Sequence, residues 1–403
     1  ELNAASVDRA VSRVNSQVSD RTMDLMVDAQ SSFEDALLGA SDPTSGLTRL
    51  KFLDSELLLA LTLIRDSSHA GISEMSPQKG EDPDVAARNQ RARGGLEELH
   101  DYAGTLISQG NDSVLWIDHD GKPPTLHSAP LSVAHLLRDR LFAEKFAVVT
   151  SATLTTSGNF DSITSALGLD SDKRTEAIDV GSPFDYGQQG ILYVAADLPP
   201  PGRDGLDMTS LDVMGELVEA AGGRTLILCS SWRAVDKAAE YLRVRCDTPV
   251  HVQKKGESVS LLVERFAADR ESTLIGTLSL WQGVDIPGDS CIQVIIDRIP
   301  FPRPDDPVMS ARSARVDESG GSGFQSVTLP RAGLLLAQAS GRLIRTGTDK
   351  GVVSVLDSRL ANSGYGTSLR KSMPPMWFTT DRTTAMSSLQ RLRGESEEWE
   401  GQG

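Results

Sequence analysis

The sequence predicts an α/β protein with a helical part of about 110 residues, followed by a parallel β-sheet covered by helices. Apolar residues recur every three or four positions between Val7 and Ile107, which is the spacing of one helix face. Farther along, short runs of Val, Ile and Leu alternate with helical patterns, as expected for strands buried on both faces. The 403 residues, 39% of them hydrophobic, suffice for two or three globular domains.

The helical part is predicted from apolar residues at a spacing of three or four, such as Val11 with Val14 and those within Leu57–Leu63. A polar segment with several glycines and prolines, residues 66–84, predicts a long surface loop. Val85–Leu106 then resumes a helix. This part of the sequence carries almost no strand signal.

A change of pattern follows the helical part. Ser113–Asp118 alternates between apolar and polar residues, and Asp120-Gly121 is a turn signal before Thr125–His127, so we expect a β-hairpin. Buried strands are then expected at Ala147–Thr150, Ile191–Ala195, Leu226–Cys229, Thr273–Ile275, Ile292–Ile296 and Val352–Leu356. Because helical patterns separate these runs, the strands should be parallel.

Composition limits the classes of function. A net charge of -16 argues against binding nucleic acid by bulk electrostatic attraction, so any such contact must be local. The three cysteines show no metal-ligand spacing and are expected to be buried thiols. The sequence has no apolar run long enough for a membrane span and a polar start unlike a signal peptide. We therefore expect a cytoplasmic protein without a membrane partner.

The strongest local signal follows Pro330, which can start a helix. Gln338, Gly341, Arg342 and Arg345 then stand at positions i, i+3, i+4 and i+7, so in a helix they would share one face. Two arginines one turn apart make a good clamp for a phosphate chain, because the guanidinium group binds oxyanions bidentately and stays charged. The plainer alternative is a solvated basic helix end that favours the helix dipole.

A second signal is Gly276–Gly288, directly after an apolar strand. Ligands of parallel sheets bind at the carboxyl ends of strands. Here Thr277 and Ser279 can donate to phosphate oxygens, and Asp285 can accept from a ribose hydroxyl. The alternative is an ordinary turn that Pro287-Gly288 ends.

Two further segments are weaker signals by themselves. Val148–Leu154 is an apolar strand that ends in small hydroxyl residues, which usually satisfy only backbone groups. Leu226–Trp232 is a strand that enters a helix through two serines, and free amides there can bind a phosphate. Serine at this position is equally often a plain helix cap.

In combination and in this order, the four segments resemble the DinG-like helicases of superfamily 2, which are related to the XPD helicases. The resemblance runs from about Ser113 to Leu392. It extends to Gly181–Asp185, Pro300–Pro302, Asp306-Pro307, Asp349–Val353 and Leu356–Arg359. It implies a RecA-like motor domain with the P-loop NTPase fold, as the second helicase domain, and an N-terminal helical Arch-like domain. The implied domains are an Arch-like domain at 1–110, a remnant of the first RecA-like motor domain at 111–175 and the second RecA-like domain at 176–403.

The resemblance also implies roles for individual residues. The residues expected to couple the state of bound ATP to the state of bound DNA are Ser151, Ala152 and Thr153. The residues expected to contact DNA are Ser230, Ser231, Thr277, Ser279 and Trp281. Those expected to contact ATP are Gly283, Asp285 and Gly341, and those expected to act in catalysis are Gln338, Arg342 and Arg345, with the two arginines as a finger pair. Gln282 stands where the family usually has Glu. No metal ligand is implied.

A complete motor of this type also needs a G-x-x-x-x-G-K-[ST] loop for phosphates and an acidic box for magnesium. The sequence contains neither, and its single Gly-Lys pair, Gly121-Lys122, is followed by prolines. We therefore expect a chain that begins just after the acidic box, is part of a longer protein and is inactive alone. ATP and Mg²⁺ would be held mainly by the N-terminal motor half, and the chain does not support an iron-sulfur cluster of its own.

The expected function is that of an ATP-dependent DNA helicase that moves 5′ to 3′ on single-stranded DNA and unwinds duplex junctions, in repair or replication. The expected partners are single-stranded DNA, duplex junctions and the N-terminal motor half. One alternative is a noncatalytic module that binds single-stranded nucleic acid or a protein. Another is nuclease activity acquired through an extra domain, although the sequence shows no acidic metal cluster to support it.

Overall fold

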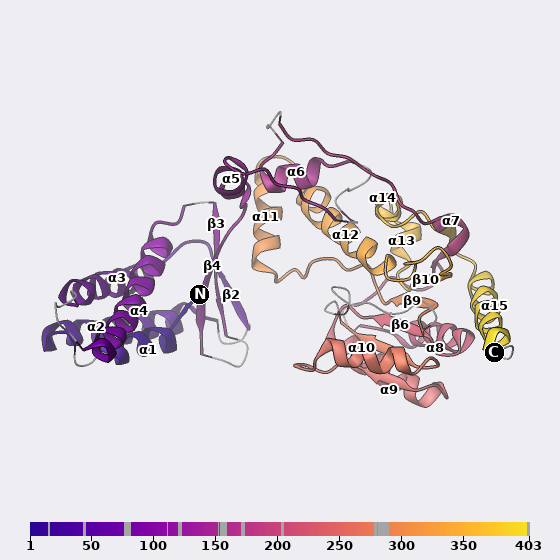
Figure 1. The fold of residues 1–403 in the computed structure, drawn as a ribbon, viewed down its shortest axis with the longest axis horizontal. Helices are drawn as coiled ribbons and strands as arrows, with labels where there is room; N and C mark the ends of the chain where they lie inside the picture. Colours follow the sequence, from indigo (N-terminus) through magenta and orange to yellow (C-terminus); the bar gives the residue numbers. More distant parts are fainter. Residues whose placement is uncertain are drawn as a thin grey trace. The chain divides into compact units, whose positions relative to one another are not determined.

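The computed structural model describes residues 1–14, 17–42, 46–75, 82–110, 112–119, 123–151, 153, 159–170, 174–202, 205–277, 280 and 290–400, with side chains up to Gly394. The chain forms two compact units (Figure 1). Unit 1 comprises Glu1–Val133 and Arg303–Gly320, and unit 2 comprises Ala134–Pro302 and Gly321–Gly403. Among the described helices, none has the length and hydropathy that crossing a bilayer requires.

Unit 1 combines a helical layer with a small sheet. Its elements are β1 (Leu2–Asn3), α1 (Ala4–Val14), α2 (Asp20–Ala40), β2 (Leu47–Leu50), α3 (Ser55–Glu74), α4 (Pro83–Ile107), β3 (Ser113–Asp118), β4 (Thr125–Pro130) and α11 (Pro307–Glu318). Helices α1 to α4 bury one apolar face each in a common core that includes Phe33, Leu61 and Leu96. Asp54 caps α3 by accepting from the amide of Leu57 at 2.8 Å. The loop expected from residue 66 begins later, because α3 continues to Glu74.

The sheet of unit 1 is antiparallel, in the order β1-β4-β3-β2. The predicted hairpin is confirmed as β3 and β4, with Asp118 opposite Thr125. Strands β1 and β2 were not predicted, because they are too short to show an alternating pattern. The hairpin therefore belongs to the same compact unit as the helices, whereas the sequence placed a boundary near residue 110.

Helix α11 also belongs to unit 1, although it lies far along the chain within the range assigned to the second motor domain. Arg312 donates from Nε to the carbonyl of Leu131 at 2.7 Å. Arg315 and Asp112 form an ion pair at 2.6 Å. Such contacts join segments that no local pattern connects.

Unit 2 is built on a parallel sheet of seven strands, in the order β11-β5-β10-β9-β6-β8-β7. Its strands are β5 (Gly190–Val194), β6 (Thr225–Leu228), β7 (Val250–Val252), β8 (Thr273–Gly276), β9 (Gln293–Ile296), β10 (Gly351–Val355) and β11 (Trp377–Thr379). Its helices are α5 (Ala134–Leu137), η1 (Arg138–Phe142), α6 (Asp161–Leu167), α7 (Tyr186–Gln189), α8 (Met208–Ala221), α9 (Trp232–Arg245), α10 (Val259–Ala268), η4 (Phe324–Thr328), α12 (Leu329–Ser340), α13 (Arg359–Asn362), α14 (Gly366–Ser372) and α15 (Arg382–Glu400). The parallel α/β architecture is confirmed, and five of the expected buried strands are present.

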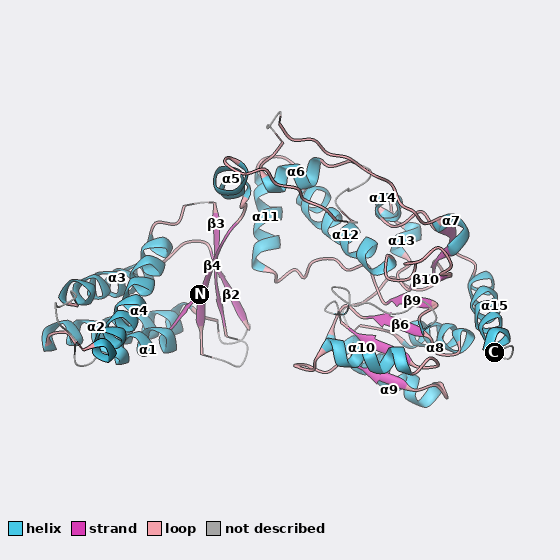
Figure 2. Cartoon of the chain, in the orientation of Figure 1, coloured by secondary structure: helices cyan, strands magenta, loops and turns pink. Residues whose placement is uncertain are grey.

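Helices cover both faces of this sheet, as Figure 2 shows with helices in cyan and strands in magenta. Alternate residues of a strand point to opposite faces, so Leu226 and Leu228 pack with α10, α12 and α14. Ile227 lies between them and packs with α8, α9 and α15. All three cysteines are buried thiols, as expected.

One predicted strand is wrong. Ala147–Thr150 forms no strand, and the side chains of Phe146 and Val148 are 98% and 75% exposed. An isolated strand cannot satisfy its backbone amides and carbonyls without a neighbour, and no described strand pairs with this segment. An apolar run of this kind becomes a buried strand only when it pairs with a sheet. The described residues contain no sheet that pairs with it.

Candidate nucleotide and nucleic-acid site

The carboxyl ends of the parallel strands bring polar side chains to one edge of the sheet. Ser230, Thr277, Asp297 and Asp357 follow β6, β8, β9 and β10 within two residues. In open α/β sheets this edge is where ligands bind. We call it the carboxyl edge.

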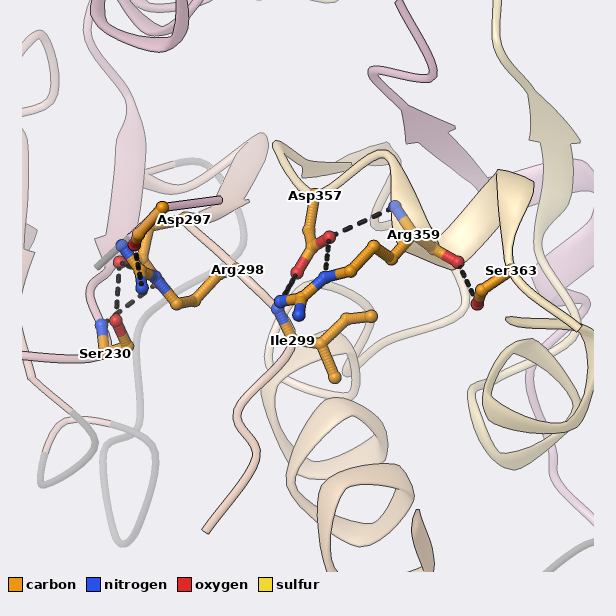
Figure 3. A network of polar contacts seen from close by, with 8 residues as sticks. Ser230, Asp297, Arg298, Ile299, Asp357, Arg359 and Ser363 are labelled. Carbon is orange, nitrogen blue, oxygen red and sulfur yellow. Dashed lines mark hydrogen bonds and ion pairs between the residues drawn. The ribbon is translucent and has the colours of Figure 1, made fainter. Parts of the chain in front are cut away.

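At the carboxyl edge, Ser230 is held by a buried carboxylate (Figure 3). Its amide and its hydroxyl both donate to Asp297, at 3.0 and 2.9 Å. Burial raises the pKa of Asp297 to about 6, although the bonds from Ser230 and the nearby Arg298 act in the opposite direction. The next residue, Ser231, caps α9 by accepting from the amide of Ala234 at 3.2 Å. Ser231 is therefore the N-cap of α9.

Asp357 organises the neighbouring strand end (Figure 3). It is fully buried and accepts from the amide of Ile299 at 2.9 Å. Arg359 binds the same carboxylate with Nε and a terminal nitrogen, at 2.9 and 2.7 Å. This fork-shaped pair orients the guanidinium group, and the bond from Ile299 ties the ends of β9 and β10 together.

Thr277 is fixed by a residue that sequence reasoning missed. Its amide and its hydroxyl donate to Oε1 of Gln253, at 2.9 and 3.2 Å. Gly276 is required beside them, because a Cβ there would meet the side chains of Gln253 and Leu280. Gln253 follows the end of β7, and that position was the only signal that could have identified it.

The arginines lie in a loop at the opposite edge, which we call the arginine loop (residues 341–350). The expectation that Gln338, Arg342 and Arg345 share a helical face is wrong, because α12 ends at Ser340. The backbone then tightens, with the amide of Arg342 donating to Ala339 at 3.3 Å. Leu343 enters the core next to it. The α-helix therefore does not continue into the loop, and the buried Leu343 stands between the two arginines in the chain.

Two residues outside the predicted set hold the arginine loop. Asp349 accepts from the amides of Arg345 and Thr346, both at 2.8 Å. Gln189 donates to the carbonyls of Thr346 and Asp349, both at 2.9 Å. Gln189 directly precedes β5, and the loop directly precedes β10, so both stand at the amino edge of the sheet.

The electrostatics of the arginine loop suit an anionic ligand. Burial lowers the pKa of Arg342 and of Arg345, and Asp349 partly opposes this shift for Arg345. Arginine stays charged at neutral pH despite such shifts. Oε1 of Gln338, in the last turn of α12, is buried and has no hydrogen-bond partner among the described residues. Chemically, the two arginines suit the oxygens of a phosphate chain, and Oε1 of Gln338 suits a hydroxyl group or a water molecule that donates a hydrogen bond.

The structure thus divides the predicted residues between two edges. Ser230, Ser231 and Thr277 stand at the carboxyl edge, and Gln338, Gly341, Arg342 and Arg345 stand at the end of α12 that leads to the amino edge. The five residues of β10 separate these edges by about 16 Å. The two groups cannot bind one phosphate together.

Several predicted residues cannot be placed. Ala152, Ser279, Trp281, Gly283 and Asp285 lie outside the described residues. Ser151 is exposed, and its hydroxyl accepts from the amide of Thr153 at 3.2 Å. The described residues contain no group of three or more His, Cys, Asp or Glu that could hold a metal ion.

Comparison with known proteins agrees with this architecture. Residues 214–376 match the helicase C-terminal domain family. The chain is 51% identical over 308 residues to the ATP-dependent helicase DinG of Mycobacterium tuberculosis, covering 74% of this chain and 46% of the relative. It is 37% identical over 281 residues to the ATP-dependent DNA helicase YoaA of Haemophilus influenzae, covering 68% of this chain and 42% of the relative.

The fold is similar to that of solved XPD structures. The structure of Xpd4 from S. tokodaii matches with a TM-score of 0.55 at 14% identity, over 94% of this chain and 71% of that chain. The chain spans somewhat less than half the length of the curated relatives it matches. With its helicase C-terminal domain and its similarity to DinG, the chain belongs to the DinG-like helicases, and its RecA-like fold is similar to that of XPD structures.

Proposed function

We propose that this chain is the C-terminal part of a cytoplasmic ATP-dependent DNA helicase that moves 5′ to 3′ along single-stranded DNA and unwinds duplexes in repair or replication. In this proposal an N-terminal motor half supplies the phosphate loop, the acidic box and the ligands of Mg²⁺. The observation that carries the proposal is the arginine loop, in which Asp349 and Gln189 bind the backbone of a segment that carries two half-buried arginines.

The arginine loop would act on ATP from the far wall of the cleft between motor halves. Arg342 and Arg345 would stabilise the charge that spreads over the transferred γ-phosphoryl group. Gln338 would use its buried Oε1 to orient water or a ribose or protein donor in the same cleft. Gly341, with Gly283 and Asp285, would complete the contacts to ATP.

The carboxyl edge would hold the DNA strand. The hydroxyls of Ser230, Ser231 and Thr277, with Ser279 and Trp281, would contact the backbone and bases of single-stranded DNA. Asp297 and Gln253 already orient two of these residues, which supports a preformed surface. Contacts of this kind suit a chain of net charge -16, because they are local and need no broad basic surface.

The segment from Phe146 to Thr153 would connect the two motor halves. Its exposed apolar residues support the idea that it completes the sheet of the first motor domain. Ser151, Ala152 and Thr153 would then lie where ATP-dependent closure of the cleft reaches the DNA. Unit 1, with its helical layer, would be the Arch-like domain.

The test is magnesium-dependent ATP hydrolysis, with and without single-stranded DNA, by this chain and by a version extended at its N-terminus with the preceding coding sequence. We expect hydrolysis only in the extended protein and stimulation by DNA. In that protein Arg345→Ala should lower turnover by about 10³- to 10⁵-fold and leave the fold intact. Arg331→Ala, at an exposed position of α12, is the control.

Two results would contradict the proposal. Normal ATPase activity in the extended Arg345→Ala protein would exclude the arginine-finger role. Failure of both proteins to hydrolyse ATP, together with binding of single strands, would favour the noncatalytic binding module, and the arginines would then be phosphate clamps only.

A further inference from the structure

Unit 2 contains a cavity of about 680 Å³ beside the carboxyl edge. One wall is α9, which starts directly after Ser230 and Ser231. The other is the end of β7, the outermost strand of the sheet, and the turn that follows it. The volume lies within the range of about 300 to 1,000 Å³ that small-molecule sites occupy.

The α9 wall presents one face of the helix to the cavity. Trp232, Asp236, Glu240 and Arg243 line it at positions i, i+4, i+8 and i+11. The side of α9 that packs on the sheet is a different one, carried by residues such as Val235 and Leu242. Trp232 is half-buried and lines the cavity.

The opposite wall is a basic turn. Lys254 and Lys255 are exposed and line the cavity, and Gly256 turns the chain with φ of +80°. In the part of the chain that the structure describes, neither lysine is engaged in an ion pair. The preceding residue is Gln253, whose side chain holds Thr277. The turn is therefore fixed to the carboxyl edge and continues it.

We propose that this cavity binds one unstacked nucleotide of the single strand, with the base on Trp232 and a phosphate on Lys254 and Lys255. Proteins that hold single strands combine aromatic platforms with cations that follow the backbone, and both are present here. The carboxylates of Asp236 and Glu240 repel phosphate from the α9 wall and can accept from the exocyclic amino group of a base.

This inference rests on the proposed function, because the nucleotide is part of the strand that crosses the carboxyl edge. It adds a binding position that the motifs do not contain. The strand would leave the Ser230 and Thr277 region and turn along the outermost strand of the sheet. The site accordingly lengthens the bound segment by one nucleotide and adds one phosphate contact.

The test measures binding of a fluorescein-labelled oligodeoxycytidine to the full chain by anisotropy over a series of salt concentrations. Trp232→Leu should weaken binding by about 5- to 150-fold, the loss expected when a stacked base loses its platform. Lys254→Ala with Lys255→Ala should weaken binding and reduce the slope of log K against log salt by about 0.7, the contribution of one single-strand phosphate contact. Lys371→Ala, on an exposed part of α14, should change neither quantity.

Trp232→Phe separates stacking from folding. Phenylalanine still stacks, so this variant should retain most of the affinity and lose part of the tryptophan quenching that DNA causes in the parent chain. If the parent binds DNA and all Trp232 and lysine variants bind with unchanged affinity, salt slope and quenching, the cavity proposal is overturned and the proposed function stands. If neither the parent chain nor the N-terminally extended protein binds single-stranded DNA, both are overturned.

Discussion

The buried carboxyl of Asp297 predicts a specific dependence of stability on pH. Its side chain is almost completely buried behind Ser230, and burial raises its pKa from 3.8 to about 6. Between these two values the folded chain keeps a proton that the unfolded chain releases. The contribution of Asp297 to the free energy of unfolding is therefore fully present below pH 4 and is lost as the pH rises through 6.

The magnitude follows from the size of the shift. A difference of about 2 pKa units corresponds to about 3 kcal/mol, at 1.36 kcal/mol per unit. Asp297→Asn removes the titration and keeps the bonding pattern of the protonated acid. The amide oxygen can accept from the backbone of Ser230, and the amide nitrogen can donate to its hydroxyl. We expect the variant to gain up to about 3 kcal/mol over the parent chain between pH 4 and pH 7.

The assay is urea unfolding followed by circular dichroism, for the parent chain and the variant, at half-unit steps from pH 4 to pH 7.5. Other carboxyls titrate in both proteins, so the difference between the two curves isolates Asp297. Asp305→Asn is the control, because that exposed carboxyl has a pKa lowered by Arg303 and its pair is worth at most about 1 kcal/mol. Parallel stability curves for the parent and Asp297→Asn would refute the reasoning.

Three further predictions concern single groups. Asp357→Asn should lower the free energy of unfolding by about 1.5 to 3 kcal/mol, because the buried carboxylate loses the charge that strengthens its bonds from Ile299 and from the one-third exposed Arg359; a loss below 1 kcal/mol in urea unfolding would contradict this. Gly223→Ala should lower the free energy of unfolding by well over 1 kcal/mol, since φ is +78° and the new Cβ would collide with the backbone of Glu271. Gly256→Ala has a similar φ and open space around the new Cβ, so it should lower the free energy of unfolding by about 1 to 2 kcal/mol. Equal melting temperatures for these two variants would show that the collision is absent. Asp349→Ala removes the acceptor of two loop amides, so it should loosen the arginine loop and lower ATP turnover of the extended protein at least tenfold, with little change in DNA affinity. Unchanged turnover would show that Asp349 does not position the arginines.

Much of the fold could be predicted because it depends on patterns within short segments. The hairpin at 113–130 shows an alternation and a turn signal, and five buried strands are continuous apolar runs between helical patterns. The strands β1, β2 and β11 escaped prediction because two to four residues carry no pattern. The run at Ala147–Thr150 has the composition of a buried strand and no described partner strand, so composition alone misassigned it.

The candidate site was predicted by its residue types more than by its geometry. The motif around Arg342 and Arg345 was found from sequence, but its helical face was wrong because α12 ends at Ser340 and the amides of Arg345 and Thr346 donate to Asp349 instead of to a further helical turn. The residues that hold the site, among them Gln189 and Gln253, were missed. Their partners stand 160 and 24 residues away along the chain.

The sequence by itself determined which segments are apolar, which turn, and which family's motifs they carry in order. Only the tertiary structure decided that Ser230 and Thr277 share one edge of the sheet while the arginine loop stands at the other. It also decided that Asp297 is buried against Ser230 and that α11 returns to unit 1. The physical reason is that strand order and register, which pair residues distant in the chain, are set by packing of the whole sheet and are not encoded in any local spacing.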